Sequence, residues 1–398
     1  MKSVERKVLF VHDGPMYVNE ATKQYFGVHY DDKLVNRYKF LGRKVVFLMR
    51  TKSISEKDIK RYSPIKSEDF GFIQIPDFKS IRTYFKHKSI AKKIIISAVN
   101  EHDLIIVRLP SAAGTIAFNE AVRINKPVLV EFVACVYDAL WNYDWRGKLL
   151  AHYKLHQYKQ LMKKASHTIF VTKEFLQSRY PAGGKAIGCS DVEILPPQDH
   201  ILENRINRYR KENEVLILGT VAALNVPYKG QADVIKAIGI MKKQGFLLKY
   251  KLVGQGSPAS LEAAILKYDV AGLVEIIGHL QHNEIFNFLE EIDIYIQPSK
   301  VEGLPRAVIE AMSKACPVFG SNIGGIPELI DKNCLFDPGN IDEIIIKLKQ
   351  INNNWLKLQA EKNFETAKEY QKEILEIRRT SFYTQFLNDW KLNNKSLV

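Results

Sequence analysis

Two glutamates enclose a glycine-proline turn in the stretch that runs from Ser299 to Glu310. Pro305 suits the first turn of a helix, where its missing N–H leaves no hydrogen bond unmade, so the amides of Gly303 and Leu304 have no helical partners. Free amides at the start of a helix bind phosphate groups. The segment therefore predicts a phosphate-binding turn with a carboxylate on either side of it.

The second glutamate, Glu310, would lie one to two turns along this helix, where its neighbours in sequence are apolar. A carboxylate buried without partners costs several kcal/mol, on the order of a buried polar group or more. It therefore needs hydroxyl or N–H donors, and the diol of a ribose supplies two. The alternative is an acidic helix start whose buried glutamate is satisfied by amides of the protein itself.

The spacing of the two glutamates alone proves little, since it recurs at Glu361 and Glu369 in a charged segment near the C-terminus. The flanking sequence is more specific. An apolar run over 292–296 precedes the turn. A second apolar run, which begins at Pro317, follows it, and then comes the glycine-rich stretch 324–328. This order of strand, loop, helix, strand and glycine loop resembles the retaining nucleotide-sugar glycosyltransferases of family 4. Their hallmark is a Glu-x7-Glu element that ends a strand and opens a helix.

The resemblance implies roles for the residues of this turn. Glu302 would orient the transferred sugar through its hydroxyls, and Glu310 would hold the ribose diol of a nucleoside diphosphate sugar. The amides of Gly303 and Leu304 would stabilise the negative charge that grows on the departing diphosphate. The other donor-binding residues that we expect in this half are Ser299, Pro305, Arg306, Gly254, His279 and Leu280, the last two beside the nucleobase.

Lys229 follows the first strand expected in the second half. In the family, the matching loop usually carries an arginine and a lysine that hold the donor diphosphate. Lys229 matches the lysine, and we expect it to act in catalysis with Glu302. Ala223 stands at the arginine position, and Arg306 is the nearest cation that would replace it. A lysine on a solvated turn is the alternative interpretation of Lys229.

The resemblance also predicts which cofactors and donor the reaction uses. No Asp-x-Asp pair occurs in the sequence, which agrees with an architecture that does not rely on a divalent ion. We therefore expect transfer without a metal ion or any other cofactor. A uridine diphosphate sugar is the favoured donor because such donors are common in these enzymes, although no residue excludes a guanosine nucleotide.

The first half carries weaker signals for the acceptor. His12 and Asp13 would end the first strand and reach the cleft, and Gly14 would approach the donor diphosphate. A polar turn after a strand explains these residues equally well. Asp138 stands near the place where the family often has a histidine, and we count it as a further acceptor contact.

Two charges interrupt otherwise apolar stretches of the first half. Arg108 lies within 104–110 and Glu131 lies within 127–133. Each side chain either faces the cleft or pairs with the other in the interior. We count Arg108 among the expected acceptor-binding residues.

Both halves alternate short β-branched runs with longer helical patterns, as in parallel sheets built from βαβ units. Together with the resemblance, this predicts an α/β protein of GT-B architecture, in which two doubly wound Rossmann-like domains face each other across a cleft. The expected strands are 7–13, 43–50, 70–76, 104–110, 127–133 and 168–172 in the first half and 215–222, 248–253, 274–277, 292–297 and 317–320 in the second.

Two prolines at 196 and 197 separate the halves. We expect an N-terminal acceptor-binding domain over 1–195 and a C-terminal nucleotide-sugar-binding domain over 196–370. The resemblance implies that a helix over 371–398 crosses back to the first domain. Its apolar face would consist of Phe382, Tyr383, Phe386 and Trp390. A surface helix that packs within the second domain is the alternative.

The chain of 398 residues has a net charge of +14, all of it within residues 1–195. A basic domain beside a neutral one indicates an anionic partner such as acidic lipid, a diphosphate-bearing acceptor or nucleic acid, unless the charge serves solubility alone. Four distant cysteines favour a reducing cytoplasm and core positions. The charged start does not resemble a signal peptide, and no apolar run reaches the roughly 20 residues of a membrane span. We therefore expect a cytoplasmic protein that is soluble or peripheral on the inner face of the membrane.

Residues 78–95 combine isoleucines and aromatic residues with six Lys or Arg, in the pattern of a basic amphipathic helix. Such a helix lies on anionic lipid, or else it belongs to the domain, with its apolar residues in the core and its lysines in water. The cluster Tyr137, Trp141, Tyr143 and Trp145 offers rings that stack on sugar or lipid, and core packing explains it equally well.

These observations favour a retaining glycosyltransferase that moves a sugar from a nucleotide-sugar donor to a glycan acceptor. A polyprenyl-diphosphate-linked oligosaccharide, as in capsule, O-antigen or exopolysaccharide assembly, suits the charge asymmetry best. A nucleotide-sugar epimerase of the same architecture is the first alternative, but it would need no basic acceptor domain. A basic nucleic-acid-binding protein is the second. No nucleic-acid reading motif is recognisable, and that function would leave Glu302 and Glu310 unexplained, so we expect no nucleic-acid partner.

Overall fold

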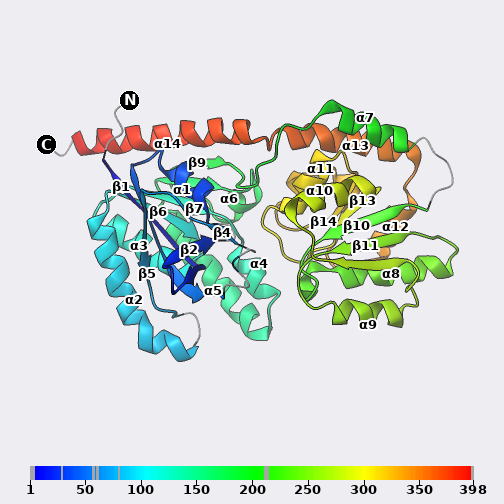
Figure 1. Ribbon diagram of the computed structural model, residues 1–398, viewed down its shortest axis with the longest axis horizontal. Coiled ribbons are helices and arrows are strands. Elements are labelled where there is room, and N and C mark those ends of the chain that lie inside the picture. Colours follow the sequence, from blue (N-terminus) through cyan, green and yellow to red (C-terminus); the bar gives the residue numbers. More distant parts are fainter. Residues whose placement is uncertain are drawn as a thin grey trace.

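The computed structural model describes residues 5–27, 30–55, 59, 62–78, 81–209 and 215–395, and all structural statements concern these residues. They form two units side by side, each built on its own sheet with helices around it (Figure 1). The predicted α/β class with two largely parallel sheets is confirmed. All four cysteines are buried free thiols, as expected for core residues.

The first sheet has nine strands within the described residues. Its strands run parallel except for β2, which lies antiparallel to both of its neighbours, β1 and β4. The strands are β1 (Lys7–Asn19), β2 (Gln24–Gly27), β3 (Lys44–Ser53), β4 (Ser63–Pro64), β5 (Phe70–Gln74), β6 (Leu104–Leu109), β7 (Val128–Phe132), β8 (His167–Phe170) and β9 (Lys185–Gly188).

Helices cover both faces of the first sheet because successive residues of a strand point to opposite sides. On β1, Val8 and Phe10 belong to one core and Leu9 and Val11 to the other. The helices of this unit are α1 (Asp32–Tyr38), α2 (Ile81–Glu101), α3 (Ala112–Arg123), α4 (Val136–Trp141), α5 (Trp145–Met162) and α6 (Phe175–Arg179).

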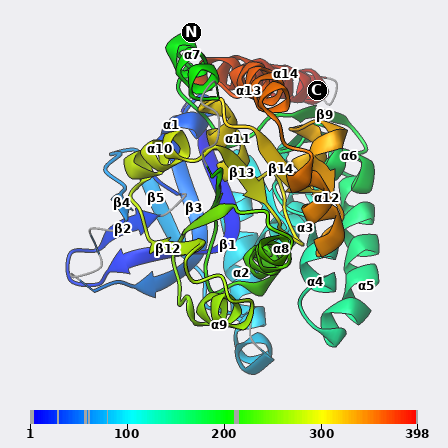
Figure 2. The ribbon, with the colours of Figure 1, turned by 90° about the vertical axis from the view of Figure 1, so that its right-hand side faces the viewer.

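The second sheet has six parallel strands in the order β12-β11-β10-β13-β14-β15. Figure 2 shows α8 and α9 on one side of it and α10 and α11 on the other. The strands are β10 (Ile217–Val221), β11 (Lys249–Val253), β12 (Val274–Gly278), β13 (Ile294–Gln297), β14 (Val318–Ser321) and β15 (Leu335–Phe336). The helices are α7 (Asp199–Arg208), α8 (Gln231–Lys243), α9 (Ala259–Lys267), α10 (His282–Glu291), α11 (Arg306–Ser313), α12 (Ile341–Lys349) and α13 (Asn353–Lys368).

The first strand is longer than the expected 7–13, and that boundary is wrong. β1 continues to Asn19 because its last residues pair with both β2 and β3, after a register shift between Val11 and Pro15. His12, Asp13 and Gly14 therefore lie within an irregular part of the strand and not after its end. The other expected strands are present, with ends that differ by a few residues.

The last helix, α14 (Lys372–Lys395), leaves the second unit and lies along the first (Figure 1). Its Phe382, Tyr383 and Phe386 are buried in the same core as Val8 and Phe10 of the first sheet. Asp389 near its end accepts hydrogen bonds from His167 of β8 and Lys185 of β9, at 2.9 and 2.7 Å.

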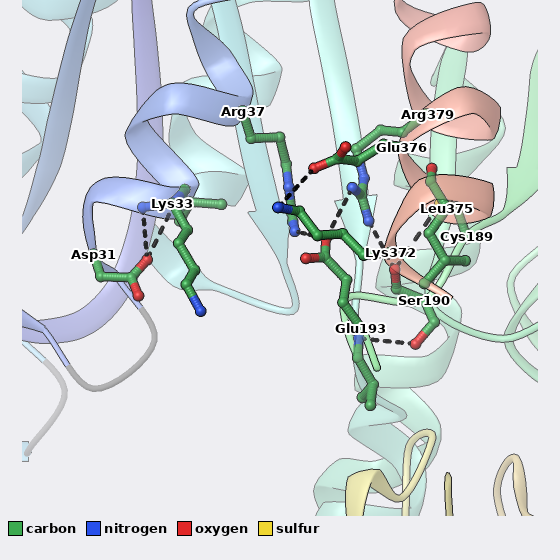
Figure 3. A network of polar contacts seen from close by, with 12 residues as sticks. Asp31, Lys33, Arg37, Cys189, Ser190, Glu193, Lys372, Leu375, Glu376 and Arg379 are labelled. Carbon is green, nitrogen blue, oxygen red and sulfur yellow. Dashed lines mark hydrogen bonds and ion pairs between the residues drawn. The ribbon is translucent and has the colours of Figure 1, made fainter. Parts of the chain in front are cut away.

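A polar network also fastens α14 to the first unit (Figure 3). Glu193, in the connection between the two units, accepts hydrogen bonds from Arg37 of α1 at 2.6 Å and from Arg379 of α14 at 3.2 Å. Arg379 also donates to the carbonyl of Ser190 at 2.8 Å. One carboxylate thus holds two helices that are far apart in sequence.

The chain crosses between the units twice, and the two crossings meet. The Ile194 amide donates to the Tyr370 carbonyl at 3.1 Å, and the Lys372 amide donates to the Ile194 carbonyl at 3.0 Å. These bonds form a parallel bridge between Ile194 and Gln371. Both connections therefore lie side by side at one place.

Candidate functional site

The turn between the two glutamates connects β13 to α11 at the carboxyl edge of the second sheet, where parallel sheets commonly bind ligands. Pro305 has φ −74° and ψ 114°, and it is the last residue before the helix, which begins at Arg306. The prediction that Pro305 lies in the first helical turn is therefore wrong by one residue. Among the described residues, no acceptor contacts the amides of Gly303 and Leu304, whereas the carbonyl of Gly303 accepts a bond from the Gly325 amide at 2.6 Å.

Glu302 and Lys229, the two residues expected to act in catalysis, are in contact. The Lys229 Nζ lies 2.5 Å from the Glu302 Oε1, and their side chains are 22% and 10% exposed. Lys229 ends a short turn over Pro227–Lys229 that follows β10. The loops after β10 and β13, two neighbouring strands, thus bring an ammonium and a carboxylate together.

A buried glutamine, Gln297, orients Glu302 through a hydrogen bond, and sequence reasoning missed it. The Gln297 Nε2 donates to the Glu302 Oε1 at 3.0 Å and to the Ser299 Oγ at 2.9 Å. Its Oε1 accepts a bond from the Tyr295 hydroxyl at 2.6 Å, which fixes the orientation of the amide. Gln297 and Ser299 are buried. The only signal in the sequence is a glutamine that closes an otherwise apolar strand.

Glu310 is 5% exposed on α11. None of the described residues donates a hydrogen bond to its carboxylate, and burial raises its pKa to about 7, against the opposing charge of Arg306. A buried carboxylate without protein donors fits a ligand that brings hydroxyl groups. Arg306 itself is exposed at the start of the helix.

Two glycines of the loop after β14 pack closely against the main chain of the turn. Gly324 has φ +61°, and a Cβ at this position would lie 2.3 Å from the Glu302 carbonyl oxygen. A Cβ on Gly325 would lie 2.8 Å from the Gly303 carbonyl oxygen. Only glycine allows this approach of the two backbones. The glycine loop therefore fixes the main chain on which Glu302 and the free amides stand.

A pocket of about 610 Å³ lies at the ends of β11 and β12, on the same sheet edge as the turn. It contains Gly254 and His279, two of the expected donor-binding residues, together with Gly278 and Tyr62, the last from the first unit. A Cβ on Gly254 would lie 1.8 Å from the carbonyl oxygen of residue 222, so the loops after β10 and β11 are in direct backbone contact. Leu280 packs at the rim of the second core.

The first unit contacts the candidate turn directly. A Cβ on Gly303 would lie 3.0 Å from the carbonyl oxygen of Val133, just after β7. Glu328, from the glycine loop, accepts hydrogen bonds from the amides of residues 173, 174 and 175 at the start of α6, at 2.6, 3.1 and 2.5 Å. Sequence reasoning did not identify Glu328 because its partners lie about 155 residues away.

The expected acceptor residues near β1 have partners inside the protein. Asp13 is buried and accepts hydrogen bonds from the amides of Ala112 and Ala113 at 2.6 and 2.8 Å, at the start of α3. The His12 Nδ1 accepts a bond from the Gly14 amide at 2.8 Å and lies 2.7 Å from a tyrosine hydroxyl. The structure thus places all three within the hydrogen-bond network of the first unit.

Arg108 and Glu131 form a buried ion pair at 2.8 Å, the second of the two arrangements expected from the sequence. The Tyr38 hydroxyl donates to the same carboxylate at 2.9 Å. Asp138 is buried and pairs with Arg179 at 2.5 Å. These four charges have partners within the first unit, and the contact of Arg108 and Asp138 with an acceptor remains a prediction.

Two further properties concern the described residues as a whole. They contain no group of three or more His, Cys, Asp or Glu side chains arranged to hold a metal ion. None of the helices in the described ranges is long and apolar enough to cross a membrane.

Comparison with known proteins adds to this geometry. Residues 202–372 match the family model described as Glycosyl transferases group 1. Protein CapJ of Staphylococcus aureus is 29% identical over 97% of this chain and 98% of its own length. The amylovoran biosynthesis glycosyltransferase AmsK of Erwinia amylovora is 38% identical over 37% of this chain and 38% of its own length.

Among solved structures, Anabaena Alr3699/HepE in complex with UDP and glucose has a TM-score of 0.63. Its sequence is 15% identical, and the alignment covers 96% of this chain and 99% of that chain. At this identity the likeness shows the fold alone. Together with the two sheets, it shows that the chain has the GT-B fold, and the family match and the relatives indicate a glycosyltransferase whose residues 202–372 are similar to the group 1 family.

Proposed function

We propose that this glycosyltransferase transfers a sugar from a nucleoside diphosphate sugar with retention of configuration and without a metal ion. The observation that carries the proposal is the grouping of Lys229, Glu302 and the free amides of Gly303 and Leu304 at one sheet edge. A cation and unpaired amides suit a diphosphate, and a carboxylate suits sugar hydroxyls. This grouping also matches the Glu-x7-Glu element of family 4.

The proposed chemistry follows from where charge develops. As the bond from the sugar to the diphosphate breaks, negative charge grows on the departing oxygen and positive charge on the sugar ring. Lys229 and the amides of Gly303 and Leu304 would stabilise the departing diphosphate, each such contact being worth typically about 10²–10³ in rate. The Glu302 carboxylate would then lose its Lys229 partner to the diphosphate and accept hydrogen bonds from the sugar.

The donor of the proposal is a uridine diphosphate sugar. The pocket lined by Gly254 and His279 has room for a nucleobase, and Glu310 offers a buried acceptor for the ribose diol. The Anabaena protein of similar fold was solved in complex with UDP and glucose, which supports this choice. Ser299 and Pro305 would contribute by shaping the turn, Arg306 by its charge, Gly14 from the opposite unit, and Leu280 by its backbone.

The proposed acceptor is a glycan, carried on a polyprenyl diphosphate, in the assembly of a surface polysaccharide. AmsK, named for amylovoran biosynthesis, supports a polysaccharide product. The charge of +14 confined to residues 1–195 supports an anionic acceptor or membrane surface. His12, Asp13, Arg108 and Asp138 are proposed as residues that support the acceptor side, directly or through the elements they fasten.

The test is a thermal-shift panel of nucleoside diphosphate sugars, run without metal on the parent protein, Lys229→Ala and Glu310→Ala. A donor at 100 times its Kd should stabilise the parent by about 2.7 kcal/mol and should fail to stabilise either variant. Glu361→Ala is the matched control, because Glu361 begins the second Glu-x7-Glu spacing, on an exposed face of α13. If no donor stabilises the parent, the proposal fails, and if the variants respond like the parent, the site is wrongly placed.

A further inference from the structure

The first unit exposes large apolar side chains on α4 and the start of α5. We call this the aromatic surface. Their exposed fractions range from 39% for Trp141 to 81% for Tyr143. The aromatic surface consists of Trp141, Tyr143, Trp145, Leu149, Leu150 and Tyr153. A group of six such residues within 141–153 differs from the single exposed apolar residues that any soluble protein carries, and it indicates an interaction site.

The buried face of α5 lies away from these side chains. Gly147 packs against α4, where a Cβ would lie 2.2 Å from the Leu140 carbonyl oxygen, and Tyr158 and Met162 pack in the core of the first unit. Asp144 caps the helix by accepting a hydrogen bond from the Gly147 amide at 2.7 Å. The buried face and the cap therefore set the position of α5. Trp141 stacks on the Tyr137 ring, with 5.5 Å between the ring centres, and the other side chains of the aromatic surface are exposed by half or more.

Cations stand among the exposed rings. Residues 141–164 contain six Lys or Arg against one Asp. The Arg146 guanidinium lies 5.3 Å from the Trp145 ring centre, and the Lys148 ammonium lies 5.5 Å from the Trp141 ring centre. Tryptophan and tyrosine prefer the headgroup level of a bilayer, and lysine and arginine are attracted to anionic headgroups. The composition and charge of the aromatic surface complement an anionic bilayer.

The helix over residues 78–95 was the other candidate for this role. Where its side chains are described, Ala91 and Ile95 are buried in the core, and Ile90 is 52% exposed beside lysines. This part of α2 is a domain helix with a basic outer face. The residues at 79 and 80, and the side chains of 81–86, lie outside the described part of the chain.

We propose that the aromatic surface docks the first unit onto the headgroup region of a membrane that contains anionic lipid. The inference rests on the proposed function, because it supplies the route to a lipid-linked acceptor. α4 begins at Val136, directly after β7 and Val133, whose carbonyl faces Gly303 of the candidate turn. Docking at α4 and α5 therefore brings a lipid headgroup to the edge of the first sheet that faces the donor turn.

The experiment is co-sedimentation of the full chain with vesicles of phosphatidylcholine, with and without about 30% phosphatidylglycerol, at two salt concentrations. The parent should bind the anionic vesicles at least roughly ten-fold more tightly than the neutral ones, and salt should weaken that binding because it screens the cations. Trp145→Ser with Leu149→Ser should reduce binding to anionic vesicles roughly ten-fold. Arg146→Gln with Lys148→Gln should reduce mainly the difference between the two vesicle types.

The matched control is Leu266→Ser with Ile377→Ser, two apolar residues that are 77% and 69% exposed on other helices. This control should bind vesicles like the parent. The proposal is overturned if the parent does not bind anionic vesicles, or if the Trp145/Leu149 variant binds as the parent does. It is also overturned if that variant instead abolishes concentration-dependent self-association in sedimentation velocity, because the surface would then join two copies of the chain.

A donor thermal shift on the same proteins separates this inference from the proposed function. The Trp145/Leu149 variant should keep the parent's melting temperature and donor shift, since its changes are in solvent and away from the donor turn. If the Trp145/Leu149 variant loses vesicle binding but keeps the donor-induced rise in melting temperature, the aromatic surface acts in membrane docking and not in donor binding. A parent that binds vesicles but responds to no donor overturns the proposed function and leaves membrane docking in place.

Discussion

Buried charged side chains have partners from the protein in the first unit, whereas one in the second unit has none among the described residues. In the first unit, Asp13, Arg108 and Asp138 are buried with hydrogen-bond or ion-pair partners from their own unit. In the second unit, on the helix that follows the candidate turn, the Glu310 carboxylate is buried, and none of the described residues donates a hydrogen bond to it. The difference teaches that a buried charge indicates a ligand site only when the fold leaves it without partners. Four substitutions test this contrast, from the largest expected effect to the smallest.

Arg108→Met should destabilise the protein most. Among the described residues, it leaves Glu131 as a buried charge with the Tyr38 hydroxyl as its remaining donor. Breaking a buried pair from one side costs about 3–5 kcal/mol. The free energy of unfolding, from urea denaturation, measures the loss. Lys23→Met is the control, because both side chains of its pair with Glu20 are exposed, by 73% and 59%, and exposed pairs contribute about 0–1 kcal/mol. Equal losses in the two variants would show that burial of the pair is irrelevant.

Lys229→Ala should lower kcat by about 10²–10³, which corresponds to roughly 3–4 kcal/mol of transition-state stabilisation. The free energy of unfolding should fall less than in Arg108→Met, since the Lys229 side chain is 22% exposed and Glu302 keeps the hydrogen bond from Gln297. Steady-state kinetics with the donor found in the thermal-shift panel measures the effect. Lys332→Ala, an exposed lysine of the same unit, should leave kcat unchanged, and a similar loss there would remove the special role of Lys229.

Glu310 should make the stability of the ligand-free protein depend on pH. Its pKa rises from 4.5 to about 7 in the folded protein, so between these values the folded state binds the proton and the unfolded state does not. The free energy of unfolding therefore falls as pH rises through this window, by up to about 3 kcal/mol. Glu310→Gln should remove that slope in denaturation curves recorded from about pH 4.5 to about pH 7.5.

The same group should affect donor binding in the opposite direction. Ribose hydroxyls donate to the ionised carboxylate, so donor affinity should increase as pH rises toward the pKa of about 7 and should level off above it. Calorimetric titration of the parent and Glu310→Gln at several pH values checks this. A variant that keeps both pH dependences would assign them to another group.

Gln297→Leu should have the smallest overall effect. It should lower the free energy of unfolding by about 1–3 kcal/mol, because the buried Tyr295 hydroxyl loses its acceptor at 2.6 Å and keeps the more distant Val221 carbonyl at 3.4 Å. It should lower kcat more than donor affinity, since Glu302 loses the donor that orients it. Gln359→Leu is the control. Gln359 lies on α13, away from the turn, and it is also buried, but its amide contacts Asp331. If the two variants show equal decreases in the free energy of unfolding and equal decreases in kcat, Gln297 contributes to folding alone.

The architecture was predictable from the sequence because parallel strands are apolar runs with clear helical patterns between them. Short strands were missed, since β2, β4, β9 and β15 have two to four residues and no alternation that distinguishes them from loops. The length of β1 was missed for another reason. Its extension depends on pairing with β2, and nothing in residues 13–19 indicates that partner.

The turn between Glu302 and Glu310 was predicted from a motif that is local in sequence, and its role in donor binding stays a prediction. The contact of Lys229 with Glu302 spans 73 residues and was expected only through the resemblance. Gln297 and Glu328 act through partners that only the folded chain brings near. Two arrangements were open for the charges at 108 and 131, because a sequence names the charged residues but not the direction in which each side chain points.

The return of α14 to the first sheet has a consequence for how this chain is made. The first unit is discontinuous in sequence, with its N-terminal sheet and its last helix separated by the whole second unit. During synthesis, the core around Val8 and Phe10 stays incomplete until Phe382 and Tyr383 emerge, while the second unit is complete beforehand. We expect that a chain truncated before α14 leaves an apolar face of the first sheet uncovered, and that the second unit folds ahead of the sheet that precedes it.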